Sequence, residues 1–263
     1  MTFDVFDTLL WRRVLFPADA FGLLPHGRRA PALRAAAEAG VTFWCRRVLR
    51  REPRLADIYR YYPFEPESEL ALEAGLCQAN RWCLALVKDL VARGVTVAAV
   101  SDMYLSAEQI SALLGVAGYP GLPVFVSSEA NLSKRGDGRL FLHVGERLGA
   151  APPAWMHVGD NEHADVAMAQ LHGLSVCHVQ TPRNTLLALL PALSQRRRTP
   201  EEALFLGEVA IALHWRLATV AELPSDLACR LARALAQSGR RESWTAQLVV
   251  ERALAPLVAE AST

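Results

Sequence analysis

Two aspartates stand five residues apart in a polar segment that follows an apolar run. The segment reads Gly159-Asp160-Asn161-Glu162-His163-Ala164-Asp165, and the run before it reads Ala154-Trp155-Met156-His157-Val158. The run predicts a strand, and the segment predicts the loop into the next helix. Ligands of open α/β sheets gather at such strand ends. Carboxylate oxygens there suit Mg²⁺, whose other positions take water and phosphate oxygens. We therefore predict a magnesium site, although Gly-Asp-Asn is also ordinary turn chemistry.

Two other fragments carry polar residues at predicted strand ends. Near the N-terminus, Asp4 closes a short β-prone apolar start, and Thr8 follows four residues later. Residues 95–100 form a continuous apolar run, which is typical of a strand buried on both faces. This run ends at Ser101-Asp102, so it places a hydroxyl at a strand tip. Ser106 is the better cap for the helix that follows, which leaves Ser101 available for binding.

Lys134 stands out because this chain almost always uses arginine. Lys88 and Lys134 are the only lysines among the 28 basic residues. Lysine presents a compact point charge to a phosphate, whereas arginine presents a planar fork. We therefore predict that Lys134 binds a phosphoryl group, against the alternative of a solvated surface side chain.

An ordered set of these residues resembles the four motifs of the haloacid dehalogenase-like (HAD) hydrolase superfamily: Asp4, Ser101, Lys134 and the pair Asp160 and Asp165. The resemblance spans roughly residues 1–180. The sequence motifs FDVFDTLL and VSDMYLS are similar to those of a bacterial subgroup of predicted hydrolases. Members of that subgroup occur alone or joined to glycosyltransferase modules.

The resemblance implies a role for each motif residue. Asp4 would be the nucleophile, and Ser101 and Lys134 would hold the phosphoryl oxygens. Thr8 and Asp102 would complete the substrate-binding set. Mg²⁺ would be the cofactor, and its expected ligands are Asp4, the main-chain carbonyl of Phe6, Asp160 and Asp165, the last of these directly or through water. A carboxylate nucleophile divides one difficult displacement into two easier ones, and the cations cancel its repulsion from the phosphate.

One position departs from the pattern of the superfamily's phosphatases. These usually carry a second aspartate two residues after the nucleophile, as general acid and base, and that position is Phe6 here. Asp7 comes next, but in extended chain it would point to the opposite side. Four explanations stay open: a leaving group acidic enough to depart unprotonated, a proton carried by the cap or by water, group transfer in place of hydrolysis, or a catalytically weak domain kept for binding.

The function that the resemblance implies is that of a Mg²⁺-dependent phosphatase or phosphotransferase. It would act on a small phosphorylated metabolite through an aspartyl-phosphate. The alternative is a catalytically weak binding or scaffolding module associated with glycosyltransferase systems. Dehalogenases of the superfamily need no metal and lack the Gly-Asp-Asn type of acidic motif, which is intact here. Halide displacement therefore ranks last.

The composition bounds the class of protein. With 52% hydrophobic and 21% charged residues, the 263-residue chain can bury a full core. A net charge of +1 favours neither nucleic acid nor an anionic membrane as a partner. The five cysteines are odd in number and lack metal-type spacing, which is typical of reduced cytosolic thiols. No apolar run reaches the length of a membrane span, and no signal-peptide pattern occurs. We therefore expect a cytoplasmic protein.

The fold class that these patterns predict is α/β, with a Rossmann-like, doubly wound parallel sheet. Strands are expected at about residues 2–6, 95–100, 123–127, 154–158 and 174–179. The 92 residues between Thr8 and Ser101 are too many for a simple connection. Helical patterns separated by Pro or Gly predict that much of this stretch is a helical cap insertion.

Three parts of the chain follow from this reading. Residues 1–12 and 80–182 would form the HAD-like core, and residues 13–79 would form the cap. Residues 199–263 show helical periodicity and would form a C-terminal extension. This extension would pack on the core or offer a surface for oligomerisation or for a partner module.

Overall fold

The computed structural model describes residues 1–24, 30–152, 154–195, 197–218, 226–238 and 245–260. Parts of the predicted C-terminal extension, at 219–225, 239–244 and 261–263, lie outside the described residues. The chain divides into two compact units, of which the first comprises Met1–Arg12 and Ala20–Val179 and the second Arg13–Asp19 and Gln180–Thr263. The division into core, cap and extension stays a prediction.

The first unit is built on a parallel sheet that, in the described residues, has five strands in the order β5-β4-β1-β6-β7. The strands are β1 (Thr2–Phe3), β4 (Ala98–Ser101), β5 (Val124–Val126), β6 (Met156–Gly159) and β7 (Ser175–His178). From the central β1 the chain winds outward through β4 and β5, and later through β6 and β7 on the other side. The order therefore reverses at β1, where such folds form their ligand crevice. The predicted α/β fold is confirmed.

Helices cover both faces of this sheet because successive strand residues point to opposite sides. Ala99 packs in a cluster with residues of α4 and α5, including Val87 and Ile110. Val100, its neighbour in β4, packs with Phe141 of α8 and Ala169 of α9. Both faces of β4 are therefore buried, as its continuous apolar sequence predicts. The helices and their bounds are α4 (Arg81–Ala92), α5 (Ala107–Val116), α6 (Ser127–Ala130), α7 (Lys134–Asp137), α8 (Arg139–Leu148) and α9 (Met168–Leu171).

The caps of these helices follow from side chains named in the sequence. Ser106 accepts a hydrogen bond from the Gln109 N–H in a capping box at the start of α5. Asn80 caps α4 by accepting from the backbone N–H groups of its first turn. Ser106, and not Ser101, is therefore the cap, as expected.

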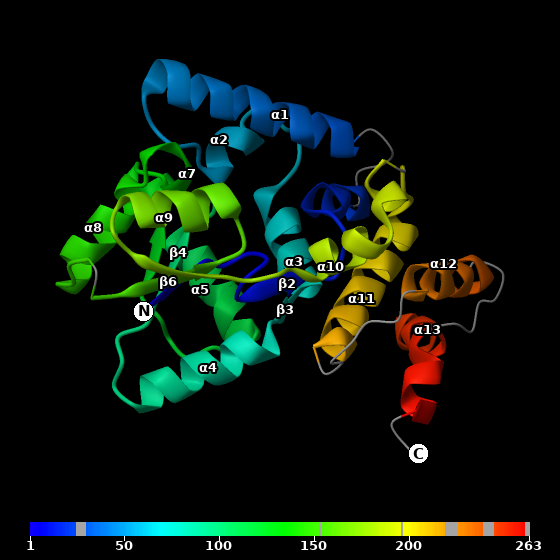
Figure 1. The fold of residues 1–263 in the computed structure, drawn as a ribbon. Coiled ribbons are helices and arrows are strands. Elements are labelled where there is room, and N and C mark those ends of the chain that lie inside the picture. Colours follow the sequence, from blue (N-terminus) through cyan, green and yellow to red (C-terminus); the bar gives the residue numbers. More distant parts are fainter. Residues whose placement is uncertain (25–29, 153, 196, 219–225, 239–244, 261–263) are drawn as a thin grey trace. The chain divides into compact units, whose positions relative to one another are not determined.

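The segment between β1 and α4 leaves and returns through two antiparallel strands, β2 (Leu10–Arg12) and β3 (Cys77–Ala79). Between them lie several helices. They are η1 (Pro17–Leu23), α1 (Ala30–Trp44), the π-helix η2 (Cys45–Leu49), α2 (Leu55–Tyr59) and α3 (Pro66–Leu76). Of these, η2 ends at Arg50 in the left-handed conformation. Helices α1 and α2 lie side by side (Figure 1). Gly40 does not interrupt α1, which continues directly into η2.

A buried ion pair joins these helices. The guanidinium of Arg34 in α1 is fully buried and donates to both carboxylate oxygens of Glu69 in α3, at 2.6 and 2.8 Å. The hydroxyls of Tyr59 and Tyr104 also donate to Glu69, each at 2.8 Å. Since Tyr104 follows the Ser101 strand end, this network ties the helices to the loop beyond β4.

The second unit is helical in the residues that the structure describes. Its elements are α10 (Pro182–Leu189), η4 (Pro191–Ser194), α11 (Pro200–Leu217), α12 (Leu227–Ser238) and α13 (Ala246–Glu260). Their core contains Val209, Leu231 and Val249, all fully buried. Gly207 allows the backbone at Arg13 to approach α11, because a Cβ there would lie 2.3 Å from the Arg13 carbonyl oxygen. No helix in the described ranges is both long enough and apolar enough to cross a membrane.

Candidate active site

The predicted site residues come from the carboxyl ends of three neighbouring strands. Asp4 directly follows β1, and its N–H donates to the Val158 carbonyl of β6 at 2.8 Å. Ser101 is the last residue of β4, and Asp160 follows β6. Because β4 and β6 flank β1 in a parallel sheet, these residues meet at one edge.

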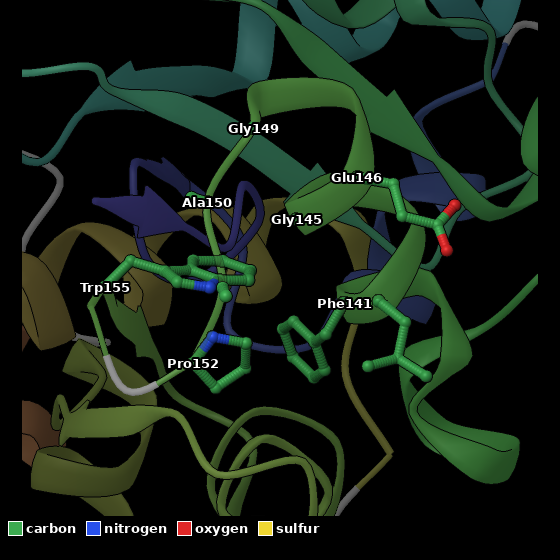
Figure 2. A pocket seen from close by; sticks show the side chains of 9 residues that line it. Phe141, Gly145, Glu146, Gly149, Ala150, Pro152 and Trp155 are labelled. Atoms are coloured by element: carbon green, nitrogen blue, oxygen red, sulfur yellow. The ribbon is translucent and has the colours of Figure 1, made fainter.

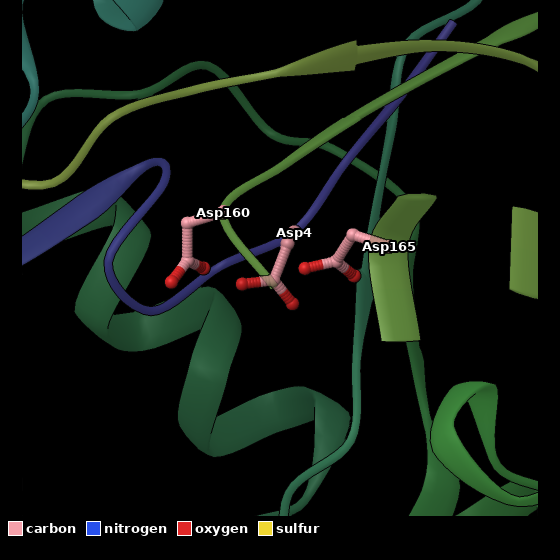
Figure 3. A group of neighbouring side chains, drawn as sticks. All are labelled: Asp4, Asp160 and Asp165. Atoms are coloured by element: carbon pink, nitrogen blue, oxygen red, sulfur yellow. The ribbon is translucent and has the colours of Figure 1, made fainter. Parts of the chain in front are cut away.

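The carboxylates of Asp4, Asp160 and Asp165 converge at this edge (Figure 3). One oxygen from each lies within 4.8 Å of the others. Asp4 and Asp165 are buried, and Asp160 is half-buried. Like charges this close repel one another, and burial strengthens the repulsion. The arrangement therefore requires cations.

Lys134 supplies one cation. Its side chain is only 2% exposed, and its Nζ donates to Asp4 Oδ1 and Asp165 Oδ1, each at 2.5 Å. Lys134 begins α7, and Asp102 holds that start. The Asp102 carboxylate accepts from the backbone N–H groups of Lys134 and Arg135, both at 2.8 Å. Asp102, predicted to bind substrate, thus contacts the backbone that carries the lysine.

Asp165 lies in a π-helix, η3 (Glu162–Ala167), where the sequence predicts an α-helix. Such wide turns occur often at functional sites. The Asp165 Oδ2 accepts from the Asn161 N–H at 3.0 Å. A Cβ on Gly159 would lie 2.4 Å from the Asp165 Cγ. Glycine is therefore needed in the Gly-Asp-Asn segment so that Asp165 can approach the end of β6.

Two further residues stand behind Asp165 that the sequence analysis did not assign to the site. The ring of His157 is fully buried, with Nε2 3.2 Å from Asp165 Oδ1. Its Nδ1 lies 3.0 Å from the hydroxyl of Thr2. A signal existed in the sequence, because a histidine inside a buried apolar strand needs hydrogen-bond partners.

Burial and the shared ammonium set the protonation of this cluster. Burial raises the pKa of Asp4 well above its usual range, and the Lys134 ammonium only partly opposes this. Burial also acts to raise the pKa of Asp165, but the ammonium and the His157 hydrogen bond lower it below its usual range. Burial lowers the pKa of His157 to about 4, so its ring is neutral at pH 7. A divalent cation beside Asp4 would favour its ionised form.

The segment between Asp4 and β2 turns sharply. Thr8 is fully buried, and its hydroxyl donates to Asp160 Oδ1 at 3.4 Å. Asp7 has a φ of 64°, so the chain bends there as a turn does. The guanidinium carbon of Arg12 lies 4.1 Å from the centroid of the Phe6 ring. The Phe6 ring thus lies against the Arg12 guanidinium. The ring itself cannot transfer a proton.

The residues present fit a divalent metal ion. The donor set consists of carboxylate oxygens, which hard cations such as Mg²⁺ and Ca²⁺ prefer over nitrogen or sulfur ligands. Asp4 and Asp160 would hold the ion, and Asp165 is engaged by Lys134, His157 and Asn161. The predicted contribution of the Phe6 carbonyl stays a prediction.

A separate apolar pocket of about 390 Å³ lies on α8 and the loop before β6 (Figure 2). Phe141, Pro152 and Trp155 line it, together with Glu146, and no predicted site residue does. The Trp155 indole N–H has no hydrogen-bond partner among the described residues. Its apolar lining does not suit a phosphate.

The comparisons with known proteins bear on the fold. No family model matches the sequence, and no curated protein matches it. Among solved structures, a HAD phosphatase from Thermococcus onnurineus is 18% identical, with a TM-score of 0.50, over 68% of this chain and 85% of that one. A dehalogenase with an intermediate complex is 17% identical, with a TM-score of 0.50, over 68% and 83%. An L-2-haloacid dehalogenase is 16% identical, with a TM-score of 0.50, over 68% and 85%. The chain has a HAD-like fold.

This HAD-like fold brings together every residue predicted to form the site's charged centre. Asp4, Asp160 and Asp165 form the carboxylate group, and Lys134 bridges two of them. Ser101 stands at the end of the neighbouring strand. The catalytic and binding roles of these residues belong to the proposal that follows.

Proposed function

We propose that the protein is a Mg²⁺-dependent phosphatase or phosphotransferase acting on a small phosphorylated metabolite. The observation that supports it best is the buried contact of Lys134 with Asp4 beside Asp160. The residues that we propose as nucleophile, phosphate-binding cation and metal ligand therefore lie close together at the carboxyl edge of the sheet. Phosphoryl transfer depends mainly on positioning and on charge neutralisation, and this group supplies both.

The first step is attack by a carboxylate oxygen of Asp4 on the phosphorus. An O–P bond to Asp4 forms as the bond to the leaving oxygen breaks, and the electron pair departs with that oxygen. Lys134 and the Ser101 hydroxyl stabilise the phosphoryl oxygens by donating hydrogen bonds. When bound, Mg²⁺ supplies charge neutralisation between nucleophile and phosphate. The product of this step is an aspartyl-phosphate.

In the second step water, or the hydroxyl of an acceptor, attacks the same phosphorus. The bond to Asp4 breaks, its electron pair returns to the Asp4 carboxylate, and the proton of the attacking group passes to solvent water. Neither step has a carboxyl at position 6 to move the proton, because residue 6 is phenylalanine. We therefore propose leaving groups that depart without protonation, which means acyl phosphates or phosphoanhydrides. The Arg12 guanidinium is itself engaged by Glu73, at 2.8 and 3.1 Å, and is nearly buried.

The competing proposal is a module that binds Mg²⁺ and phosphate without turnover. It is favoured by the same Phe6 substitution, which removes the general acid and base. A haloacid-type dehalogenase is a weaker candidate, because the carboxylate group that suits a cation is complete here. The three classes differ in what they release and in their need for metal.

Acetyl phosphate with Mg²⁺ is the substrate that tests the proposal, and an aryl phosphate, whose leaving oxygen gains more from protonation, is the slower comparison substrate. The Asp4→Asn variant should lose turnover of both, while Asp89→Asn, a similar change at an exposed helix position, should retain it. Equal rates for the wild type and Asp4→Asn would remove the enzyme hypothesis. Binding of beryllium fluoride without turnover would favour the binding module. Halide release from a 2-haloacid, unaffected by a chelator, would favour the dehalogenase.

A further inference from the structure

We propose that His157 is a positioning residue for the phosphate-binding lysine: its Nε2–H holds Asp165, and Asp165 holds the Lys134 ammonium beside Asp4. Thr2 completes the chain by fixing the other ring nitrogen. This inference rests on the proposed function, because it assigns Lys134 to the phosphoryl group.

The contacts form a continuous buried line from β1 and β6 to the nucleophile. The Thr2 hydroxyl lies 3.0 Å from His157 Nδ1, and His157 Nε2 lies 3.2 Å from Asp165 Oδ1. The same Asp165 oxygen accepts from Lys134 Nζ at 2.5 Å, and Nζ also donates to Asp4. The exposed fractions are 0% for Thr2 and His157 and 2% for Asp165 and Lys134, so water does not compete for these bonds.

The direction of each hydrogen bond follows from its partners. Asp165 is ionised beside the lysine, and a carboxylate can only accept. The Nε2 of His157 must therefore carry a proton and donate it to Asp165. The Thr2 hydroxyl lies 3.4 Å from the Met156 carbonyl oxygen and 3.0 Å from Nδ1. With hydrogen on Nε2, Nδ1 is an acceptor, and the hydroxyl donates to it in the shorter of these two contacts.

The hydrogen bonds that the Asp165 carboxylate accepts show how His157 positions Lys134. Asp165 Oδ1 accepts hydrogen bonds from His157 and Lys134, and Asp165 Oδ2 accepts one from the Asn161 N–H. With its oxygens so engaged, Asp165 is held in one orientation and acts as an anchor for the ammonium. An ammonium has three N–H donors, and two of them point at Asp4 and Asp165. The third is thereby aimed by geometry and would serve a phosphoryl oxygen.

The ring position is set by packing as well as by hydrogen bonds. The His157 ring lies edge-on to Phe141, with 4.8 Å between centroids. A phenylalanine at 157 would keep this contact and the ring volume while removing the Nε2 donor. A glutamine would place an amide N–H near the position of Nε2. These two substitutions separate packing from donation.

The tautomer can be tested without any turnover. Nuclear magnetic resonance of ¹⁵N-labelled histidine side chains reports which ring nitrogen carries the proton, and the His157→Phe spectrum assigns the signal. We expect a slowly exchanging proton on Nε2 of His157 that shifts in Lys134→Met. A ring with no proton on Nε2 would overturn the inference, whatever the activity of the protein.

The positioning role is tested by phosphate binding and by kinetics. Calorimetry with inorganic phosphate and Mg²⁺ measures the phosphate affinity of each variant. This affinity should fall about 10-fold or more in His157→Phe, as it does when a residue that orients a metal ligand is replaced. It should be largely kept in His157→Gln. With acetyl phosphate, kcat/KM should follow the same order. Equal phosphate affinity in both variants and the wild type, at unchanged unfolding free energy, would contradict a positioning role for His157. If the wild type shows no turnover, the proposed function fails, while binding and tautomer still decide this inference.

Discussion

Replacing Lys134 by methionine probes the centre of the site most directly. The substitution keeps most of the side-chain volume but removes the ammonium that lies 2.5 Å from both Asp4 and Asp165. Breaking a buried ion pair by removing one partner costs about 3–5 kcal/mol, since the remaining charge is left uncompensated. We therefore expect the free energy of unfolding at pH 7 without metal to fall by about that amount.

The dependence of this loss on pH follows from the pKa shifts. In the wild type the pKa of Asp165 is below its usual range because of Lys134 and His157, although burial opposes them. Asp165 thus contributes stability above the unfolded pKa, and this contribution is lost as pH falls. Without the ammonium, burial raises the folded pKa of Asp165 and raises that of Asp4 further above its already high wild-type position. Proton uptake then stabilises the folded state of Lys134→Met as pH falls. The difference in unfolding free energy between the variant and the wild type should therefore narrow from pH 7 toward pH 4.

Chemical unfolding of both proteins, with and without Mg²⁺, measures these changes. Mg²⁺ should stabilise Lys134→Met more than the wild type, because the cation replaces part of the missing charge. Lys88→Met is the matched control, since Lys88 is the other lysine and lies exposed on α4. Two results would refute the electrostatic reasoning. One is a loss of unfolding free energy in Lys134→Met no larger than in Lys88→Met. The other is a difference in unfolding free energy between Lys134→Met and the wild type that stays constant on acidification.

Three further changes test other parts of the structure. Gly159→Ala should lower the proposed turnover of acetyl phosphate and cost about 1–3 kcal/mol of unfolding free energy, because its Cβ would clash with Asp165. Phe6→Asp should raise hydrolysis of an aryl phosphate ester relative to acetyl phosphate by about 100-fold or more, because a carboxyl there can protonate the leaving oxygen. Arg34→Met should cost about 3–5 kcal/mol in chemical unfolding, because it leaves Glu69 buried without its cation.

Controls keep these three results interpretable. Gly40→Ala changes a glycine of α1 with no atom within 4 Å of the added Cβ, and it should not lower stability. Arg93→Met removes an exposed ion pair and should cost less than about 1 kcal/mol. An unchanged ester-to-acyl ratio in Phe6→Asp would contradict the inferred preference for acidic leaving groups. A Gly159→Ala protein as active and stable as the wild type would show that the Asp165 contact is dispensable.

The sequence was sufficient for the sheet and for the members of the charged group. Continuous apolar runs such as the one that includes Val100 predict strands buried on both faces, and β4 is buried on both. Asp4, Ser101 and Asp160 each follow or end such a run, and parallel strands in a doubly wound sheet gather their carboxyl ends at one edge. The rarity of lysine also pointed to Lys134.

Contacts across long sequence distances were decided only by the tertiary structure. The Lys134 contacts span 130 residues to Asp4 and 31 to Asp165, and no local pattern encodes such distances. The line through Thr2 and His157 depends on the register that sets Thr2 beside His157 in neighbouring strands. Periodicity and residue type show which side chains a chain can offer and on which face, because these are local properties. Which of them share a proton or a cation depends on packing to within an ångström, and that is set by the whole fold.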